Sequence, residues 1–160
     1  MSGTAKAKLE RKPKLALTVQ YGVTRATPSR FALRRWASAA LSRDANITLR
    51  IVGMREARAL NRRFRRRDYA TNVLSFEYSA RPSLVGDVAI CAPVVAREAR
   101  ERGISRDSHF AHLTVHGILH LQGHDHSEAR DARKMEDLEA RILAKLGYPD
   151  PYRSGKINAQ

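Results

Sequence analysis

The chain of 160 residues has only one cysteine, no long apolar run, and about half as many acidic as basic side chains. The single cysteine, Cys91, excludes an internal disulfide. No apolar run approaches the roughly 18 residues that indicate a membrane-spanning helix, so we expect no contact with a membrane. The charged N-terminal segment is not followed by an apolar stretch and a cleavage site, which argues against a secretory signal. These features predict a cytoplasmic protein in a reducing compartment.

The charge of the chain is positive and unevenly distributed. Thirty Lys and Arg side chains against sixteen Asp and Glu give a formal net charge of +14, and the surplus lies entirely within residues 1–81. Guanidinium groups bind phosphate oxygens in a bidentate manner, so a cluster of arginines indicates contact with a polyanion. A solvated helix face is the alternative. We predict that the densest cluster binds nucleic acid through Arg62, Arg63, Arg65, Arg66 and Arg67.

Hydrophobic patterning predicts one domain that mixes strands and helices. Strands are expected at residues 15–21, 47–51, 72–78 and 84–91. Helices are expected after the cap Thr27, over residues 54–64, from Pro93 to about Gly103, from the cap Ser105 to residue 121, and after the cap Ser127. We expect the domain to span residues 14–152, with a disordered basic tail at 1–13 and a short C-terminal tail at 153–160.

All six histidines lie between positions 109 and 126. Spacings of three, four and four residues place His109, His112, His116 and His120 on one face of a predicted helix. A buried row of imidazoles packs poorly, because each ring has two polar nitrogens that need partners. The row therefore indicates a metal site.

The pattern H-x3-H-x2-G-x2-H narrows the choice of ligands. His116 and His120 lie one helical turn apart, and Gly123 ends the helix so that His126 can supply a third nitrogen. A fourth position then stays open for water, as in catalytic rather than structural zinc sites. His124 lies near the same turn, and spacing alone does not decide between it and His126.

Two other interpretations of the histidines are possible. The pattern matches the histidine framework of the metzincin proteases, but Gly117 stands where those enzymes carry the glutamate that acts as general base. A peptidase is therefore disfavoured. His109 and His112 can be outer partners, substrate contacts or core residues, and we favour a core position for His109.

The segment His116-Gly-Ile-Leu-His120-Leu-Gln-Gly-His-Asp-His126 closely resembles the signature of the YbeY family of bacterial endoribonucleases, also described as rRNA maturation factors. A second block follows the family in order and spacing: Leu60-Asn61, Phe64-Arg65, Asp68 and Thr71-Asn-Val-Leu-Ser-Phe76. Gly86-Asp87-Val88, Leu146-Gly147-Tyr148 and Asp150-Pro151-Tyr152 extend the resemblance to about residues 15–152.

The resemblance implies a single α+β domain with a small mixed four-stranded sheet flanked by about five helices. It also implies one Zn²⁺ per chain, held by His116, His120 and His126 rather than by His124. Arg65 and His116 would be the catalytic residues. The zinc would lower the pKa of a bound water towards about 7, and Arg65 would stabilise negative charge on the phosphate.

The implied function is that of a zinc-dependent, single-strand-specific endoribonuclease in small-subunit rRNA 3′-end maturation and ribosome quality control. Its partners would be single-stranded RNA or rRNA and the small ribosomal subunit, with no role for DNA. Because the chain has only ten aromatic residues, we expect RNA binding to rest mainly on the phosphate backbone. The alternative is a non-catalytic ribosome assembly factor that binds rRNA and uses the metal only to hold its fold.

Overall fold

The computed structural model describes residues 11–124 and 127–153. Along the chain it contains β1 (Leu15–Tyr21), α2 (Arg30–Ala40), β2 (Ala45–Val52), α3 (Met54–Arg65), β3 (Val73–Ser79), β4 (Leu84–Cys91), α4 (Ala92–Arg102), α5 (Arg106–Leu121) and α6 (Ala129–Leu146). None of the helices in these ranges is both long and apolar enough to cross a membrane.

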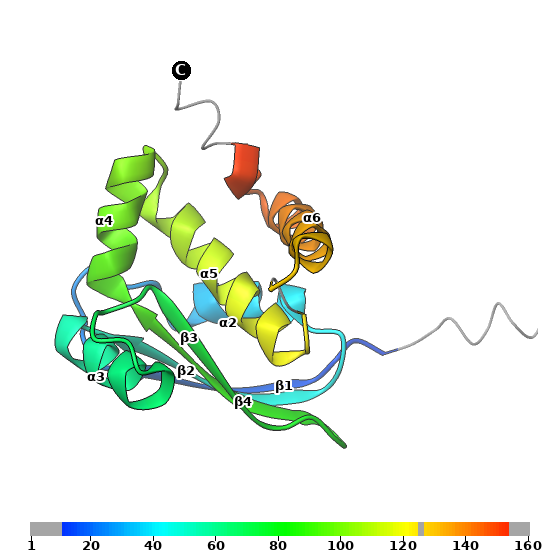
Figure 1. Ribbon diagram of the computed structural model, residues 1–160. Helices are drawn as coiled ribbons and strands as arrows, with labels where there is room; N and C mark the ends of the chain where they lie inside the picture. The colour runs from blue at the N-terminus through cyan, green and yellow to red at the C-terminus, as the bar shows by residue number, and fades with distance from the viewer. Residues whose placement is uncertain (1–10, 125–126, 154–160) are drawn as a thin grey trace, which may run out of the picture.

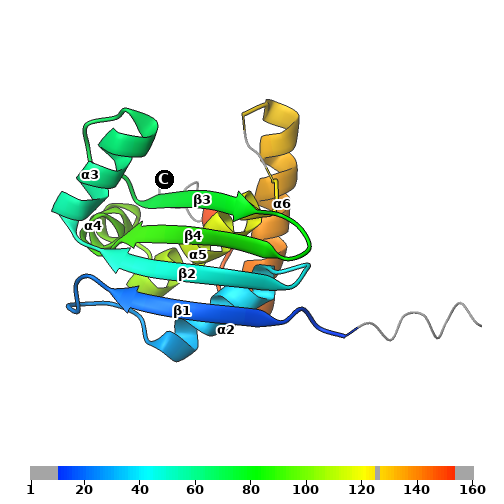
Figure 2. The same ribbon diagram turned by 90° about the horizontal axis from the view of Figure 1, so that it is seen from below.

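The four strands form one mixed sheet in the order β1-β2-β4-β3. β1, β2 and β4 are parallel, whereas β3 runs antiparallel to β4 at the edge. Helices α2, α4, α5 and α6 lie over one face of the sheet, and α3 lies at its end (Figures 1 and 2). This arrangement confirms the predicted α+β fold, with a small mixed four-stranded sheet and five helices of eleven residues or more.

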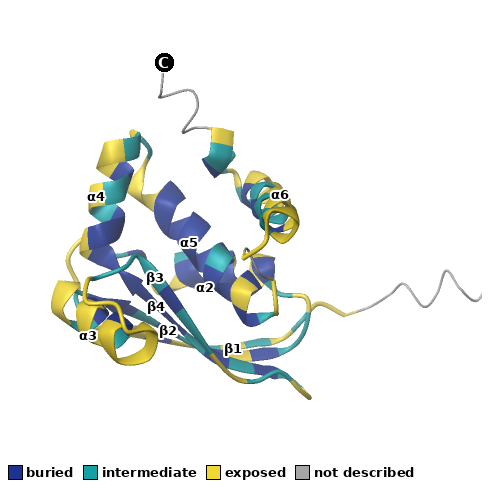
Figure 3. Cartoon of the chain, viewed as in Figure 1, coloured by how far each residue is buried: buried dark blue, intermediate teal, exposed yellow. Residues whose placement is uncertain are grey.

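The two faces of the sheet differ because strand side chains alternate. In β2, Ile47, Leu49 and Ile51 are fully buried towards the helices, whereas Thr48 and Arg50 lie on the opposite, outer face. The core therefore lies between the sheet and the helical layer, and α5 contributes much of it (Figure 3). Twelve of its sixteen residues are buried, as expected of a helix enclosed on nearly all sides.

The structure corrects the predicted N-caps of two helices. Thr27 does not cap α2, because its hydroxyl donates to the carbonyl oxygen of Thr24, and Ser29 accepts from the amide of Ala32 instead. The N-cap of α6 is Glu128, one residue later than predicted. The predicted cap Ser105 is confirmed, since its hydroxyl accepts from the Ser108 amide at 3.0 Å.

Gly117 lets α5 approach the sheet closely. A Cβ atom at this position would lie 2.8 Å from Cγ1 of Val88 on β4 and 3.2 Å from the hydroxyl of Ser75 on β3. The position where a metzincin carries its general base therefore faces the sheet and has no room for a side chain. This contact explains the departure from the protease pattern.

We predict that Gly117→Ala lowers the free energy of unfolding by about 1–3 kcal/mol, because the added methyl group overpacks the interface between α5 and β4. The loss should occur although alanine is the better helix former by about 1 kcal/mol. Urea denaturation of both proteins measures it. In a Val88→Ala background the same substitution should cost less, and an unchanged or higher stability of Gly117→Ala would contradict the close contact.

Candidate functional site

Four histidines form a continuous row along α5. The ring centroids of successive pairs lie 6.1, 6.3 and 6.4 Å apart, from His109 through His112 and His116 to His120. Exposure increases along the row: His109 is buried at 2 %, whereas His120 is exposed. The predicted common face is thus confirmed, and it leads from the core to the surface.

A buried carboxylate on α6 binds the middle of this row. Glu139 has no exposed surface, and its Oε2 accepts from Nδ1 of His116 at 2.5 Å. Its Oε1 accepts from Nε2 of His112 at 2.9 Å and from the hydroxyl of Tyr152. Burial alone would raise the pKa of Glu139, but the hydrogen bonds from the two histidines outweigh it and hold the pKa at about 2. Glu139 is therefore an anion that organises three donors.

The inner end of the row has a second carboxylate. Nε2 of His109 donates to Glu98 on α4 at 2.8 Å, and the side-chain amide of Asn72 donates to the same oxygen at 3.0 Å. Burial lowers the pKa of His109, although Glu98 opposes that shift. His109 is thus a core histidine whose Nε2 is bonded to a carboxylate, in agreement with the core position that the sequence favoured.

The outer two histidines present the same nitrogen to an acceptor. Nδ1 of His116 donates to Glu139, and Nδ1 of His120 donates to the main-chain oxygen of His124 at 3.0 Å. Their rings are stacked with an interplanar angle of 13°. Because an acceptor at Nδ1 fixes the tautomer, Nε2 is the atom of each ring that could bind a metal, which is the usual arrangement of metal-binding histidines. The donor set therefore fits a metal ion. The predicted third ligand, His126, lies outside the described residues.

A different trio also meets the geometric requirement for a metal. Ligand atoms of His112, His116 and Glu139 lie within 4.8 Å of one another, so this buried group could hold a metal ion. In the structure these atoms are joined by the hydrogen bonds described above, with Glu139 as the acceptor.

Arg65, the predicted catalytic arginine, lies at the end of α3 beside the edge strand β3. Its guanidinium donates to the main-chain oxygen of Ser75 at 2.9 Å and lies over the Phe76 ring, 5.1 Å from the centroid. The Ser75 hydroxyl donates to the oxygen of Gly117 at 3.3 Å, directly after His116 on α5. Ser75 on β3 is thus bonded both to Arg65 and to α5, the helix that carries the histidines.

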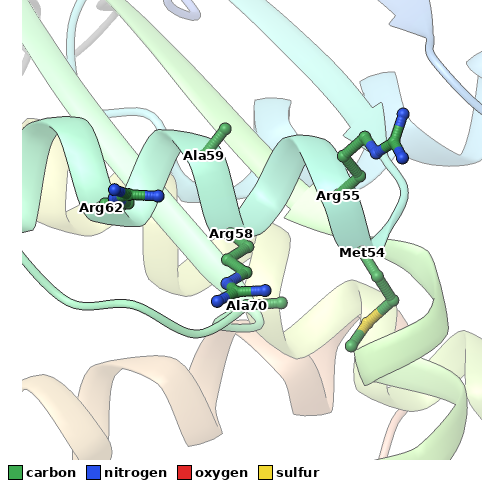
Figure 4. Close-up of a pocket in the computed structure, with 6 residues that line it drawn as sticks. All are labelled: Met54, Arg55, Arg58, Ala59, Arg62 and Ala70. Atoms are coloured by element: carbon green, nitrogen blue, oxygen red, sulfur yellow. The ribbon is translucent and has the colours of Figure 1, made fainter.

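The other predicted RNA-binding arginines are all exposed. Arg62 and Arg63 lie in the last turn of α3, and Arg66 and Arg67 follow it. Figure 4 shows a further side of α3, where Arg62 lines a pocket with Arg55 and Arg58, two arginines outside the predicted RNA contacts. The whole helix therefore presents guanidinium groups on more than one face.

Comparison with known proteins identifies the family. A family model described as Endoribonuclease YbeY matches residues 26–147. The chain belongs to the YbeY endoribonuclease family. Proteins named Endoribonuclease YbeY from Methylobacillus flagellatus and Aromatoleum aromaticum are 53% and 55% identical, covering 90% and 87% of this chain and 97% and 93% of their own length. A solution structure from Thermotoga maritima shares the fold, with a TM-score of 0.59 and 23% identity over 81% of this chain and 88% of that one.

Several residues of the YbeY-like block hold the loop after α3. Asn61 is buried, and its amide donates to the oxygen of Tyr69 at 2.8 Å. Arg58 pairs with Asp68 at 2.8 Å, and hydrogen bonding to Arg58 lowers the pKa of that carboxyl. Arg66 has a φ of 58°, in the left-handed region that favours glycine. These residues therefore fix the path of the chain between Arg65 and β3.

Sequence reasoning missed Glu139, although a signal for it exists. The buried row of α6 runs Met135, Glu139 and Leu143 at intervals of four, so a carboxylate lies among apolar residues on the face that meets α5. A charged residue on a buried helix stripe requires a partner. The sequence indicates Tyr152 only through the resemblance to the YbeY family, and in the structure its hydroxyl is one of the donors to Glu139.

We predict that Glu139→Gln lowers the free energy of unfolding by about 1–3 kcal/mol. The amide group of glutamine brings its own hydrogens into a buried site that already supplies three donors, so at least one donor loses its acceptor. Urea denaturation at pH 7 measures the loss. Glu136→Gln, on the same helix, is the matched control and should change stability by less than about 0.5 kcal/mol. Equal effects of the two substitutions would contradict the role of Glu139.

Proposed function

We propose that this chain is a zinc-dependent endoribonuclease that cuts single-stranded RNA. We further propose that it acts in the cytoplasm on the small ribosomal subunit, in rRNA 3′-end maturation and ribosome quality control. Family membership supports the ribonuclease activity. The observation that supports the metal site is the hydrogen bond at Nδ1 of both His116 and His120, which favours Nε2 as the ligand atom of each ring.

In this proposal His116, His120 and His126 hold the ion, and Glu139 acts on His116 rather than as a ligand. Its carboxylate keeps the proton at Nδ1 of His116 and fixes the ring plane, which increases the basicity of Nε2. A bound Zn²⁺ would supply a water nucleophile that is active near neutral pH and a positive charge close to the phosphate.

Arg65 is proposed to bind the scissile phosphate. Its guanidinium is held in place by the main-chain oxygens of Phe64 and Ser75 and by the Phe76 ring, so little reorganisation is needed when charge develops. Ser75 contacts the helix that carries His116, which favours a common site for the arginine and the histidines.

We predict that Arg65→Ala lowers the rate of RNA cleavage by about 10²- to 10³-fold without loss of metal, because a fixed cation that stabilises the transition state is removed. Cleavage of an end-labelled single-stranded RNA and the metal content of both proteins are the measurements. Arg106→Ala is the matched control, since this exposed arginine lies at the start of α5, outside the cluster predicted to bind RNA, and it should retain most of the activity. Full activity of Arg65→Ala with the same metal content would assign the role to a neighbouring arginine.

We predict that His120→Ala loses the bound metal and RNA cleavage but keeps its circular dichroism, because His120 is exposed at the end of α5. His112→Gln should retain the metal. Metal content by atomic absorption after dialysis distinguishes the two variants.

Loss of the metal from His112→Gln, with the metal retained by His120→Ala, would place the ion in the inner group of His112, His116 and Glu139. Unfolding of His116→Ala or of the chelated protein would favour the non-catalytic factor with a structural metal.

A further inference from the structure

The outer face of the sheet and α3 enclose a groove that is separate from the histidine row. No described helix crosses this face, and α3 stands beside one end of it (Figure 2). The cavity has a volume of about 630 Å³ and is lined by side chains of α3 and of all four strands. Its floor is formed by the outward residues of the alternating strands, including Thr48 and Arg50 on β2 and Asp87 on β4.

Three aromatic rings border this groove. Phe64 on α3 is 48% exposed and Tyr78 on β3 is 65% exposed, which makes them two of the few large apolar side chains on the described surface. Phe76, two residues before Tyr78 on β3, is the third ring and meets Phe64 edge to face, with centroids 5.1 Å apart. Exposure of such rings costs free energy, so a clustered set indicates a binding surface.

Arginines accompany the rings. Arg63 lies over Phe64 at 5.2 Å from the centroid, and Arg65 lies over Phe76 at 5.1 Å. Within the described residues neither arginine forms an ion pair with a carboxylate, in contrast to Arg50, which pairs with Glu56. The groove therefore combines exposed aromatic faces with two guanidinium groups that pair with no carboxylate among the described residues.

The lining also has three carboxylates, which equal its three arginines in number. Glu56 is neutralised by Arg50 at 2.6 Å, and Asp87 accepts a hydrogen bond from the Tyr78 hydroxyl at 2.7 Å. Glu77 is the remaining carboxylate of the lining. The two stacked guanidinium groups lie on the α3 side of the groove, where a phosphate backbone can follow them.

We propose that this groove binds single-stranded RNA by stacking its bases on Phe64 and Tyr78, while Arg63 contacts the backbone. Aromatic faces beside arginines are the usual means of binding unpaired nucleotides. The inference rests on the proposed ribonuclease function and extends it, because Arg65 borders both the groove and the strand that contacts the histidine helix. An RNA chain cut at the metal site would continue past Arg65 onto the aromatic rings. RNA binding then depends on base stacking as well as on phosphate contacts.

The test measures binding separately from cleavage. The full chain is titrated, with chelator present to stop cleavage, into a fluorescein-labelled single-stranded RNA of twelve nucleotides that contains 2-aminopurine. Phe64→Ala and Tyr78→Ala should each weaken binding by about tenfold, the loss expected for one stacked base. Tyr78→Phe keeps the ring and loses only the hydroxyl, so it should bind within twofold of the unaltered chain. Phe31→Ala is the surface control, because Phe31 is 77% exposed on α2, and it should bind normally.

Two further readouts separate stacking from charge. Fluorescence of 2-aminopurine should fall on binding to the unaltered chain and to Tyr78→Phe, but less with Tyr78→Ala. Arg63→Ala should reduce the dependence of binding on salt by about one phosphate contact, whereas the aromatic variants should leave it unchanged. Normal RNA affinity of both Phe64→Ala and Tyr78→Ala would overturn the proposal. So would equal losses with Tyr78→Phe and Tyr78→Ala.

The outcome distinguishes this inference from the proposed function. If the aromatic variants bind RNA normally and the metal-loaded chain cuts it, the stacking groove is wrong and the ribonuclease proposal stands. If the aromatic variants lose affinity while the metal-loaded, unaltered chain binds RNA without cutting it, the groove is supported and the catalytic proposal fails.

Discussion

The carboxylate of Glu139 is the interaction on which the site and much of the helical layer depend. A fully buried anion is costly unless its lone pairs are satisfied, and here donors arrive from α5 and from the C-terminal segment. The same contacts fasten α6 and Tyr152 to the histidine helix. Removing any one partner therefore affects packing and ring orientation together, which explains why a charge is tolerated at a position that an apolar residue could fill.

The close contact of α5 with the sheet is the second constraint. Gly117 allows the helix to lie against Val88 and Ser75, and this closeness turns the adjacent His116 towards α6 rather than towards the strands. The glycine that breaks the resemblance to a protease is thus required by packing. An imidazole row fixed between a sheet and a carboxylate has little freedom, as a preorganised site requires.

Much of this architecture could be predicted because the sequence patterns that indicate strands, helices and their caps are local. The alternation of Ile47, Leu49 and Ile51 predicted β2, and Ser105 was identified as the cap of α5 because a serine before a helix satisfies its free amides. The histidine spacing predicted the row along α5. Glu139 could not be paired with His116 in the same way, because that contact joins residues 23 positions apart and depends on how α6 crosses α5. The aromatic groove depends likewise on the tertiary fold, which places Phe64 of α3 against Phe76 of β3.

The uneven charge of the sequence has a structural counterpart. The basic first half of the chain supplies β1, α2, β2, α3 and β3, and the second half supplies β4 and the helices that carry the histidines and their carboxylates. The antiparallel pairing of β3 with β4 and the bond from Ser75 to Gly117 join the two halves. Arg65, in the arginine cluster, donates to the main-chain oxygen of Ser75, and the Ser75 hydroxyl donates to Gly117 on the histidine helix. In the proposed function, RNA bound by these arginines would therefore lie beside β3, the edge strand that joins the two halves.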